Sequence, residues 1–182
     1  VKAWRAGGYK GATETTRLLL NHWFYNDHRL RDGSPFKYHH SQQEAIETLI
    51  FVWEYEKVRT RKDLLQRYVP GNPDIRLPIY DIFPRYCIKM ATGTGKTKVM
   101  SLVVVWQFMN AVREDEETAR QYAKTFLIIA PNVIVFERLK IDFEGERIFR
   151  VDPLIPKHLQ VFWDFSCVLR GEGKKAYSEG ML

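Results

Sequence analysis

Cysteine is scarce in this sequence, and the two that occur, Cys87 and Cys167, lie in apolar surroundings outside any CxxC or Cys/His pattern. That spacing argues against a disulfide framework or a cysteine zinc site, and favours two reduced core thiols of a cytosolic protein. No apolar stretch of a signal peptide is visible near Val1. The longest apolar run, in residues 101–112, is shorter than the roughly 18 residues of a membrane-spanning helix. We therefore expect a cytoplasmic protein.

The excess of one charge sign is also small. The 182 residues carry 28 Lys and Arg against 22 Asp and Glu, which gives a net charge of +6. Such a balance is compatible with a nucleic-acid partner, but many proteins without one share it. Hydrophobic residues make up 45% of the chain, which is enough for a substantial core.

The first part of the chain is expected to be mainly helical. Residues 13–25 predict one short helix and residues 61–69 another. Between them, Ser41 and Glu44 have the spacing of a capping box, which predicts a helix that starts at Ser41. The buried stripe expected on that helix consists of Ala45, Ile46, Leu49, Ile50 and Trp53. Four prolines in residues 70–84 then indicate an irregular connector.

From residue 85 onward the pattern changes to alternating strands and helices. An apolar run at 85–90 is followed by a glycine-rich turn and by a long apolar segment at 98–112, which we interpret as a buried helix. A strand is predicted at 125–131, a helix at 132–143 and a further strand within 159–169. This order predicts an α/β fold with a parallel sheet.

The glycine-rich turn reads Ala-Thr-Gly-Thr-Gly-Lys-Thr at 91–97. Between a strand and a helix, such a loop directs backbone N–H groups and the positive end of the helix at a phosphate. Gly93 and Gly95 supply positive φ and close approach, Lys96 supplies a charge for the β- and γ-phosphates, and the Thr97 hydroxyl is placed to ligate Mg²⁺. The sequence therefore predicts binding of a nucleoside triphosphate with Mg²⁺.

Two other interpretations of the turn are weaker. Met90 stands where the general pattern G-x-x-x-x-G-K-[ST] has its first glycine, so an ordinary glycine turn before a helix has to be considered. A dinucleotide-binding loop would need a glycine three residues after Gly95 and an acidic ribose ligand, and neither is present.

At this point a family resemblance appears. The stretch 91–97 resembles motif I of superfamily 2 helicases and translocases, in which another residue commonly replaces the first glycine. Ser-Gln-Gln-Glu-Ala-Ile at 41–46 resembles the Q-motif region, and the stretch 128–143 resembles motif Ia. Together they are most similar to the Res-subunit branch of the type III restriction enzymes, among the DEAD/DEAH-like proteins.

The resemblance implies roles for individual residues. Gln42 would read the adenine edge, with Gln43 as its competitor, and the bound nucleotide would be ATP. Phe36 and Tyr38 would stack on the base or pack in the core. The implied ATP-binding set is Gln42, Thr92, Gly93, Thr94, Gly95, Lys96 and Thr97, of which Lys96 and Thr97 also serve catalysis.

Motif Ia contacts the nucleic-acid backbone in this family. The resemblance implies that role for Pro131, Asn132 and Arg138, although Arg138 would equally suit a solvated helix face. His39 and His40 have no partner at metal-ligand spacing, so they are interpreted as surface or packing residues.

The resemblance also implies a domain plan. Residues 1–69 would form a helical N-terminal extension, residues 70–84 a connector, and residues 85–182 the front part of a RecA-like lobe. No acidic motif II follows motif Ia: Asp164 is followed by phenylalanine rather than glutamate. Hydrolysis needs such an acidic pair and an arginine from a second lobe, so the chain is expected to be an inactive part of a longer protein.

The leading hypothesis is the ATP-binding part of a DNA helicase or translocase, the motor of a type III restriction enzyme. Its expected partners are double-stranded DNA, a methyltransferase (modification) subunit and the second RecA-like lobe of the same chain. The alternative is a P-loop module that senses nucleotide or scaffolds a partner without moving along DNA. A small P-loop kinase is weaker, since it would not need the segments at 41–46 and 128–143.

Overall fold

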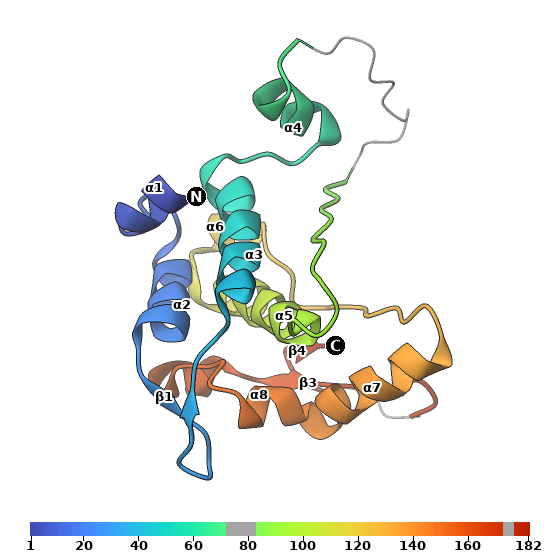
Figure 1. Cartoon of the computed structure of the whole chain (residues 1–182). Coiled ribbons are helices and arrows are strands. Elements are labelled where there is room, and N and C mark those ends of the chain that lie inside the picture. The colour runs from blue at the N-terminus through green and yellow to red at the C-terminus, as the bar shows by residue number, and fades with distance from the viewer. Residues whose placement is uncertain (72–82, 173–176) are drawn as a thin grey trace.

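The computed structural model describes residues 1–71, 83–172 and 177–182. Its α-helices are α1 (Lys2–Ala6), α2 (Glu14–Tyr25), α3 (His40–Ile50), α4 (Arg61–Tyr68), α5 (Lys96–Arg113), α6 (Glu116–Ala119), α7 (Val133–Phe143) and α8 (Arg147–Val151). A π-helical turn, Phe51–Tyr55, extends α3, and two 3₁₀ turns span Glu144–Glu146 and Lys157–Phe162. The strands are β1 (His28–Arg29), β2 (Pro35–Phe36), β3 (Phe165–Ser166) and β4 (Gly180–Met181). Figure 1 shows α5 in the middle, with α2 and α3 on one side and α7 and α8 below.

Helix α2 confirms the helix predicted in residues 13–25. Thr13 is its N-cap, and the Thr13 side chain accepts a hydrogen bond from the Thr16 N–H at 3.0 Å. The apolar side chains Leu19, Leu20 and Trp23 are at most 1% exposed. Burial of each contributes about 1.5–3 kcal/mol, so packing against the core fixes this short helix.

Helix α3 is confirmed, but the prediction of its start is wrong. The N-cap is His39, whose Nδ1 accepts the Ser41 N–H at 3.2 Å. The side chain of Gln42 completes the capping box, because its Oε1 accepts the His39 N–H at 2.9 Å. Glu44 is free of the cap and instead lies 3.3 Å from His40 on the exposed face. Histidine is an unusual cap residue, so the sequence pattern favoured Ser41.

Helix α5 confirms the long buried helix expected after the glycine turn. Its 18 residues include eleven buried ones, from Val99 to Ala111. The β-branched run at 103–105 remains helical because neighbouring elements cover most faces of the helix, so tertiary packing overrides local propensity.

One hydrophobic core joins the two parts of the chain. It contains Leu19 and Ile46 from the first helices together with Leu102, Phe108 and Leu159 from the later ones. The domain boundary expected at residues 70–84 stays a prediction, and the hydrophobic core contains residues from both sides of it. Of that connector, residues 72–82 lie outside the described part. Helix α4, just before it, stands away from the body in Figure 1, and its Arg67 forms an ion pair with Glu56.

A buried polar network behind α5 ties α2 to the π-helical turn. Glu54, 7% exposed, accepts hydrogen bonds from the Thr13 N–H at 2.9 Å, the Thr16 hydroxyl at 2.6 Å and the Trp106 Nε1–H at 2.7 Å. Burial raises the pKa of Glu54, against the effect of these donors. Asn110 closes the network by donating to Thr16 Oγ1 at 3.0 Å. These contacts fix the helix that carries the phosphate loop.

A second buried carboxylate anchors α3. Glu47 is fully buried and accepts hydrogen bonds from Tyr9 Oη at 2.8 Å, Arg5 Nε at 2.7 Å and Gln43 Nε2 at 2.8 Å. The charge of Arg5 offsets the desolvation of this carboxylate. Gln43, the competitor for adenine reading, is therefore bonded to a buried carboxylate.

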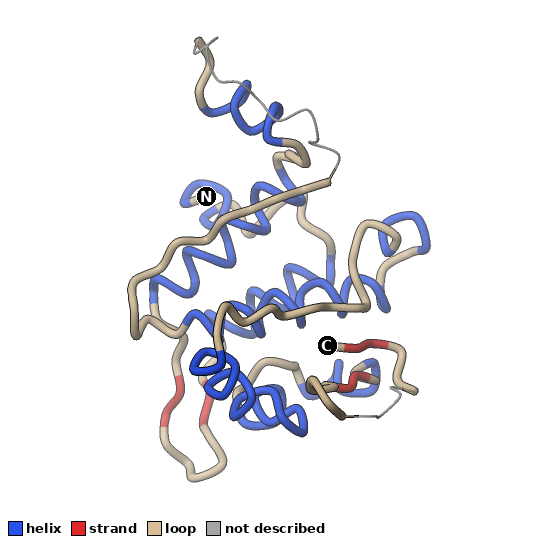
Figure 2. The backbone as a smooth tube through the Cα atoms, turned by 90° about the vertical axis from the view of Figure 1, so that its right-hand side faces the viewer, coloured by secondary structure: helices blue, strands red, loops and turns tan. Residues whose placement is uncertain are grey.

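The described sheets are much smaller than the sequence predicted. β1 pairs with β2 in an antiparallel hairpin, and β3 pairs with β4 in parallel. Figure 2 shows both pairs as short segments among long loops. The strand predicted in 159–169 is confirmed in part by β3. At 125–131 the ladder consists of one parallel bridge, Thr125 to Met181.

The strand prediction at 85–90 is wrong for the part of the chain that the structure describes. The segment forms no ladder there and runs as irregular backbone. A strand needs a partner for its N–H and C=O groups, and none of the described segments pairs with this one. A consequence is that Cys87 is exposed, which corrects the prediction of two core thiols, while Cys167 is partly buried.

No helix in the described ranges is long and apolar enough to cross a membrane.

Candidate nucleotide-binding site

The glycine turn at the start of α5 has the backbone that a phosphate loop requires. Gly93 has φ +81° and Gly95 has φ +79°, both in the left-handed region that favours glycine. Gly95 is the N-cap of α5, and its carbonyl accepts the Lys98 N–H at 3.0 Å. A Cβ placed on Gly93 would meet nothing within 4 Å, so the space over this residue is open.

Two side chains of the loop, those of Thr94 and Lys96, donate hydrogen bonds to the loop's own backbone carbonyls. Lys96 Nζ donates to the carbonyls of Ala91 at 2.8 Å and Met90 at 3.2 Å. The Thr94 hydroxyl also donates to the Ala91 carbonyl, at 2.8 Å. Lys96 is exposed, so its ammonium group can exchange these two neutral carbonyl acceptors for an anion at little cost in desolvation.

The loop fits a polyphosphate with Mg²⁺. The first N–H groups of an α-helix have no partner within the helix, and at α5 they follow directly after two left-handed glycines. Lys96 adds a mobile positive charge, and Thr97 offers its hydroxyl in the first turn. The described residues contain no cluster of three His, Cys, Asp or Glu side chains at metal-binding distance, so an ion here would depend on Thr97 and on the phosphates themselves.

Gln42 reaches the loop from α3, 52 residues away in sequence. Its Nε2 donates to the Thr94 carbonyl at 2.9 Å, and the residue is 6% exposed. The structure thus brings Gln42 to the phosphate loop, and its predicted role at the adenine edge stays a prediction. Tyr38 is 4% exposed, and its ring centroid lies 4.9 Å from that of Phe36. Of the two alternatives, stacking on the base or packing in the core, Tyr38 therefore shows core packing.

The residues expected to contact nucleic acid lie apart from the loop, at the start of α7. Asn132 is the N-cap of α7, and its Oδ1 accepts the Val135 N–H at 3.0 Å. Pro131 precedes it and Arg138 lies six residues further along, and all three residues are exposed. Their contact with a nucleic-acid backbone stays a prediction.

Comparison of the sequence with protein-family models shows which family contains this chain. The family model described as the type III restriction enzyme, res subunit, matches residues 35–158, about two thirds of the chain. The chain belongs to this family. The matched range includes Gln42, the phosphate loop and the start of α7. No curated protein and no solved structure matches the chain.

As a member of the res-subunit family, the chain is a RecA-like, ATP-dependent helicase-type module. The segments that the family model leaves out contribute to the same core. Leu19, Leu20 and Trp23, all before residue 35, pack with the helix that follows the phosphate loop. Residues before 35 therefore share one hydrophobic core with the matched range.

Sequence reasoning missed an ion pair beside the loop of this res-subunit domain. Lys98, in the first turn of α5, pairs with Asp152 at the end of α8, and Asp152 is 9% exposed. The Lys98 ammonium also lies 5.1 Å from the Phe36 ring centroid. The two partners are 54 residues apart, and no local pattern signals such a pair. It holds the start of α5 against the lower part of the molecule.

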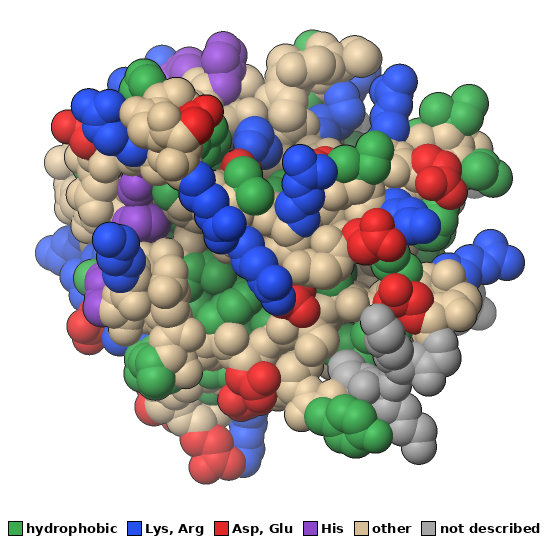
Figure 3. All heavy atoms as spheres, turned by 90° about the horizontal axis from the view of Figure 1, so that it is seen from below, with side chains coloured by type: hydrophobic (Ala, Val, Ile, Leu, Met, Phe, Trp, Pro, Cys, Tyr) green, Lys and Arg blue, Asp and Glu red, His purple; other side chains and the backbone are tan. Residues whose placement is uncertain are grey.

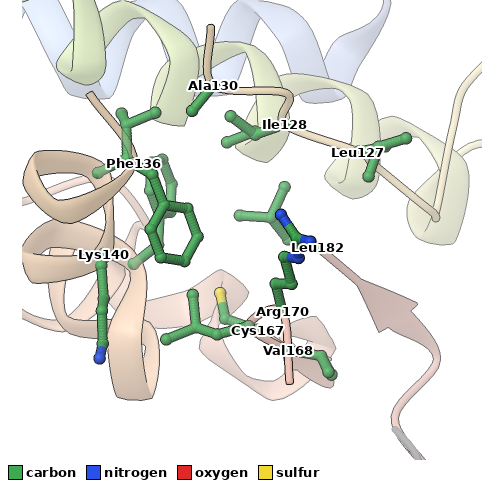
Figure 4. Close-up of a pocket in the computed structure, with 12 residues that line it drawn as sticks. Leu127, Ile128, Ala130, Phe136, Lys140, Cys167, Val168, Arg170 and Leu182 are labelled. Atoms are coloured by element: carbon green, nitrogen blue, oxygen red, sulfur yellow. The ribbon is translucent and has the colours of Figure 1, made fainter. Parts of the chain in front are cut away.

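An apolar pocket of about 370 Å³ lies next to the predicted motif Ia of the res-subunit domain. Figure 4 shows Ile128, Ala130 and Phe136 on one side and Cys167 and Leu182 on the other. The polar groups at its edge are the ends of Lys140 and Arg170. Burial raises the pKa of Cys167 to about 12, so its thiol is protonated and unreactive. The pocket is a gap in the apolar packing rather than a phosphate site.

The surface of the res-subunit domain seen from below is mixed. Figure 3 shows Lys and Arg side chains among acidic and hydrophobic ones. Among the described residues, basic, acidic and hydrophobic side chains therefore occur together on this face. Elsewhere in the described structure, basic groups are bonded to acidic ones, as Arg150 of α8 is to Glu146.

Proposed function

We propose that this chain is the ATP-binding part of an ATP-dependent DNA helicase or translocase, the motor of a type III restriction enzyme. The observation that carries the proposal is the phosphate loop. Gly93 and Gly95 are both left-handed at the start of an 18-residue buried helix, inside the range that the family model matches. The proposal includes a cytoplasmic location.

The geometry of the loop supports a separate role for each of its residues. The β- and γ-phosphates are held by the N–H groups of residues 93–97 and by Lys96, which leaves the carbonyls of Met90 and Ala91. Thr97 and the phosphates hold Mg²⁺, which neutralises charge that develops during phosphoryl transfer. Thr92 and Thr94 complete the loop, and the Thr94 hydroxyl braces it on Ala91.

The proposed partners are double-stranded DNA, a methyltransferase subunit and the rest of a two-lobed motor. Exposed apolar side chains support the last of these. Leu127 and Ile129 are 82% and 81% exposed on an extended segment, and Val133 and Ile134 are 72% and 70% exposed at the start of α7. Exposed apolar groups this close together are typical of a surface that another element covers. DNA would contact Pro131, Asn132 and Arg138.

The test is Lys96→Ala in the full-length protein that contains this chain. We expect DNA-stimulated ATP hydrolysis to be abolished while the thermal unfolding temperature is unchanged, since Lys96 is exposed and, among the described residues, bonds only to loop carbonyls. Lys89→Ala, an exposed lysine just before the loop, is the matched control and should retain activity. Normal hydrolysis in the Lys96 variant would refute the assignment. Hydrolysis that depends on Lys96 but not on DNA would favour the non-motor module.

A further inference from the structure

The positive charge of the chain is concentrated in one short segment. Residues 57–69, which we call the basic arm, contain five Lys and Arg and one Asp, a net charge of +4. The whole chain of 182 residues has a net charge of +6. A cluster of this kind, more than the net charge of the chain, is the electrostatic mark of a surface for a polyanion.

The basic arm stands out from the body of the protein. It begins after the π-helical turn Phe51–Tyr55 and includes α4, Arg61–Tyr68. Figures 1 and 2 both show α4 apart from the other helices. None of the eight residues of α4 is buried, and Leu64 and Tyr68 are 36% and 49% exposed. An isolated helix this short is only marginally stable in water, so α4 has the character of an element that a partner covers.

Two cations of the basic arm bind back to the protein. The guanidinium of Arg59 lies 3.8 Å from the ring centroid of Trp53, a cation–π contact. Arg67 forms an ion pair with Glu56, just before the arm. These contacts fix the direction in which α4 leaves the body, so the arm is held ready before any partner binds.

The two lysines of the basic arm remain available to an anion. Lys57 and Lys62 are exposed, and neither forms an ion pair with any residue that the structure describes. The one acidic residue of the arm, Asp63, is engaged in the helix cap, where its carboxylate accepts the Thr60 N–H at 3.1 Å. The lysine charges are therefore open to a partner from outside the chain.

The backbone at Lys57 adds a second observation. This residue forms the turn at which the arm begins, and its φ of +52° lies in the left-handed region. Residues other than glycine are uncommon there, and glycine would adopt the same backbone at lower cost. A lysine at this turn therefore costs stability, which is typical of positions that serve function rather than the fold.

We propose that the basic arm binds the phosphate backbone of double-stranded DNA, with Lys57 and Lys62 as its phosphate contacts. Phosphates recur along a duplex whatever its sequence, so this contact positions the DNA and does not read its bases. Figure 1 shows α4 at the top and α7 at the bottom, so the arm contacts a different part of the duplex from residues 131–138. The inference rests on the proposed function for the identity of the polyanion, and it is independent of ATP hydrolysis.

The double variant Lys57→Gly/Lys62→Ala tests the arm in the full-length protein that contains this chain. Binding to a fluorescein-labelled duplex of arbitrary sequence is followed by fluorescence anisotropy between about 50 and 200 mM salt. Each lost phosphate contact lowers the slope of log affinity against log salt by about one, so we expect a slope shallower by about two. Lys157→Ala, which removes an exposed lysine far along the chain from the arm, is the matched control and should keep the original slope.

The choice of substitutions separates loss of contact from loss of fold. Glycine adopts positive φ at less cost than lysine, and alanine is the best helix former, so the urea midpoint of the double variant should be no lower than that of the original. The charge-retaining variant Lys57→Arg/Lys62→Arg should bind the duplex with the original slope.

An unchanged slope in the double variant would overturn the inference, and so would an equal change in the Lys157 control or in the charge-retaining variant. A double variant that lost affinity for the methyltransferase subunit but kept its slope on DNA would overturn it as well, and would assign the arm to a protein partner. Failure of the proposed function looks different, since the unmodified protein would then bind the duplex at no salt concentration.

Discussion

Replacement of Glu54 by alanine tests whether the buried network behind α5 holds the N-terminal helices to the helix of the phosphate loop. The carboxylate accepts hydrogen bonds from the Thr13 N–H, the Thr16 hydroxyl and the Trp106 Nε1–H. Removal of the side chain takes away the one group that contacts all three donors.

The size of the effect depends on which hydrogen-bond acceptors each donor keeps once the carboxylate is removed. Trp106 Nε1 keeps Thr16 Oγ1 as an acceptor at 3.0 Å, and the Thr16 hydroxyl keeps Asn110 Oδ1 at 3.4 Å. The Thr13 N–H loses its acceptor and the Tyr122 hydroxyl loses its hydrogen bond to the carboxylate, which together cost about 1–3 kcal/mol, and the cavity adds to this. Relief of the buried charge offsets part of the sum, since burial raises the pKa of Glu54. We expect a net loss of about 2–4 kcal/mol in the free energy of unfolding.

Urea unfolding followed by tryptophan fluorescence measures this loss, and Glu54→Gln supplies the pH control. Because the folded pKa of Glu54 is raised above the ordinary 4.5, its contribution to stability is complete below that value and is lost as pH rises through the folded pKa. The stability of the unmodified protein relative to the glutamine variant should therefore fall as pH increases from about 4, and then level off. A difference that stays constant from about pH 4 to 8, or an alanine variant as stable as the original, would refute the reasoning.

Two further perturbations follow from the loop and from the cysteines. Gly95→Ala should lower the free energy of unfolding by about 1–3 kcal/mol more than Gly93→Ala does. Both glycines have positive φ, but only a Cβ on Gly95 would meet the Gln42 side chain. Equal losses, measured by urea unfolding, would contradict the close contact of Gln42 with the loop. Cys87 should react with iodoacetamide much faster than Cys167, whose pKa burial raises to about 12; equal rates, measured by mass spectrometry of the labelled peptides, would show that Cys167 is open to solvent.

Local chemistry in the sequence was sufficient for most helices and for the phosphate loop. The glycine turn and the buried helix after it were predictable because the spacing of glycine, lysine and threonine is a short-range signal. The start of α3 was not predictable to the residue, since His39 caps it together with Gln42. Which side chain caps the helix depends on which side chains the tertiary structure leaves available to bond to the first N–H groups of the helix.

The sheet and the long-range contacts were beyond sequence reasoning for a different reason. A strand exists only when a partner pairs with it, so the apolar segment at 85–90 has strand composition without being a strand in the described structure. The bond from Gln42 to Thr94 and the ion pair of Lys98 with Asp152 join residues more than 50 positions apart. Nothing in the local pattern of either partner indicates the other.

The core shared by α2, α3 and α5 has a consequence for how mutations in this protein are interpreted. Any substitution that loosens Leu19, Leu20 or Trp23 also lowers the fraction of molecules in which the loop at the start of α5 is formed. A genetic screen for lost nucleotide binding would return such residues beside Lys96, although none of them touches a phosphate. Added nucleotide would partly rescue them by mass action, and that rescue would separate defects of folding from defects of contact.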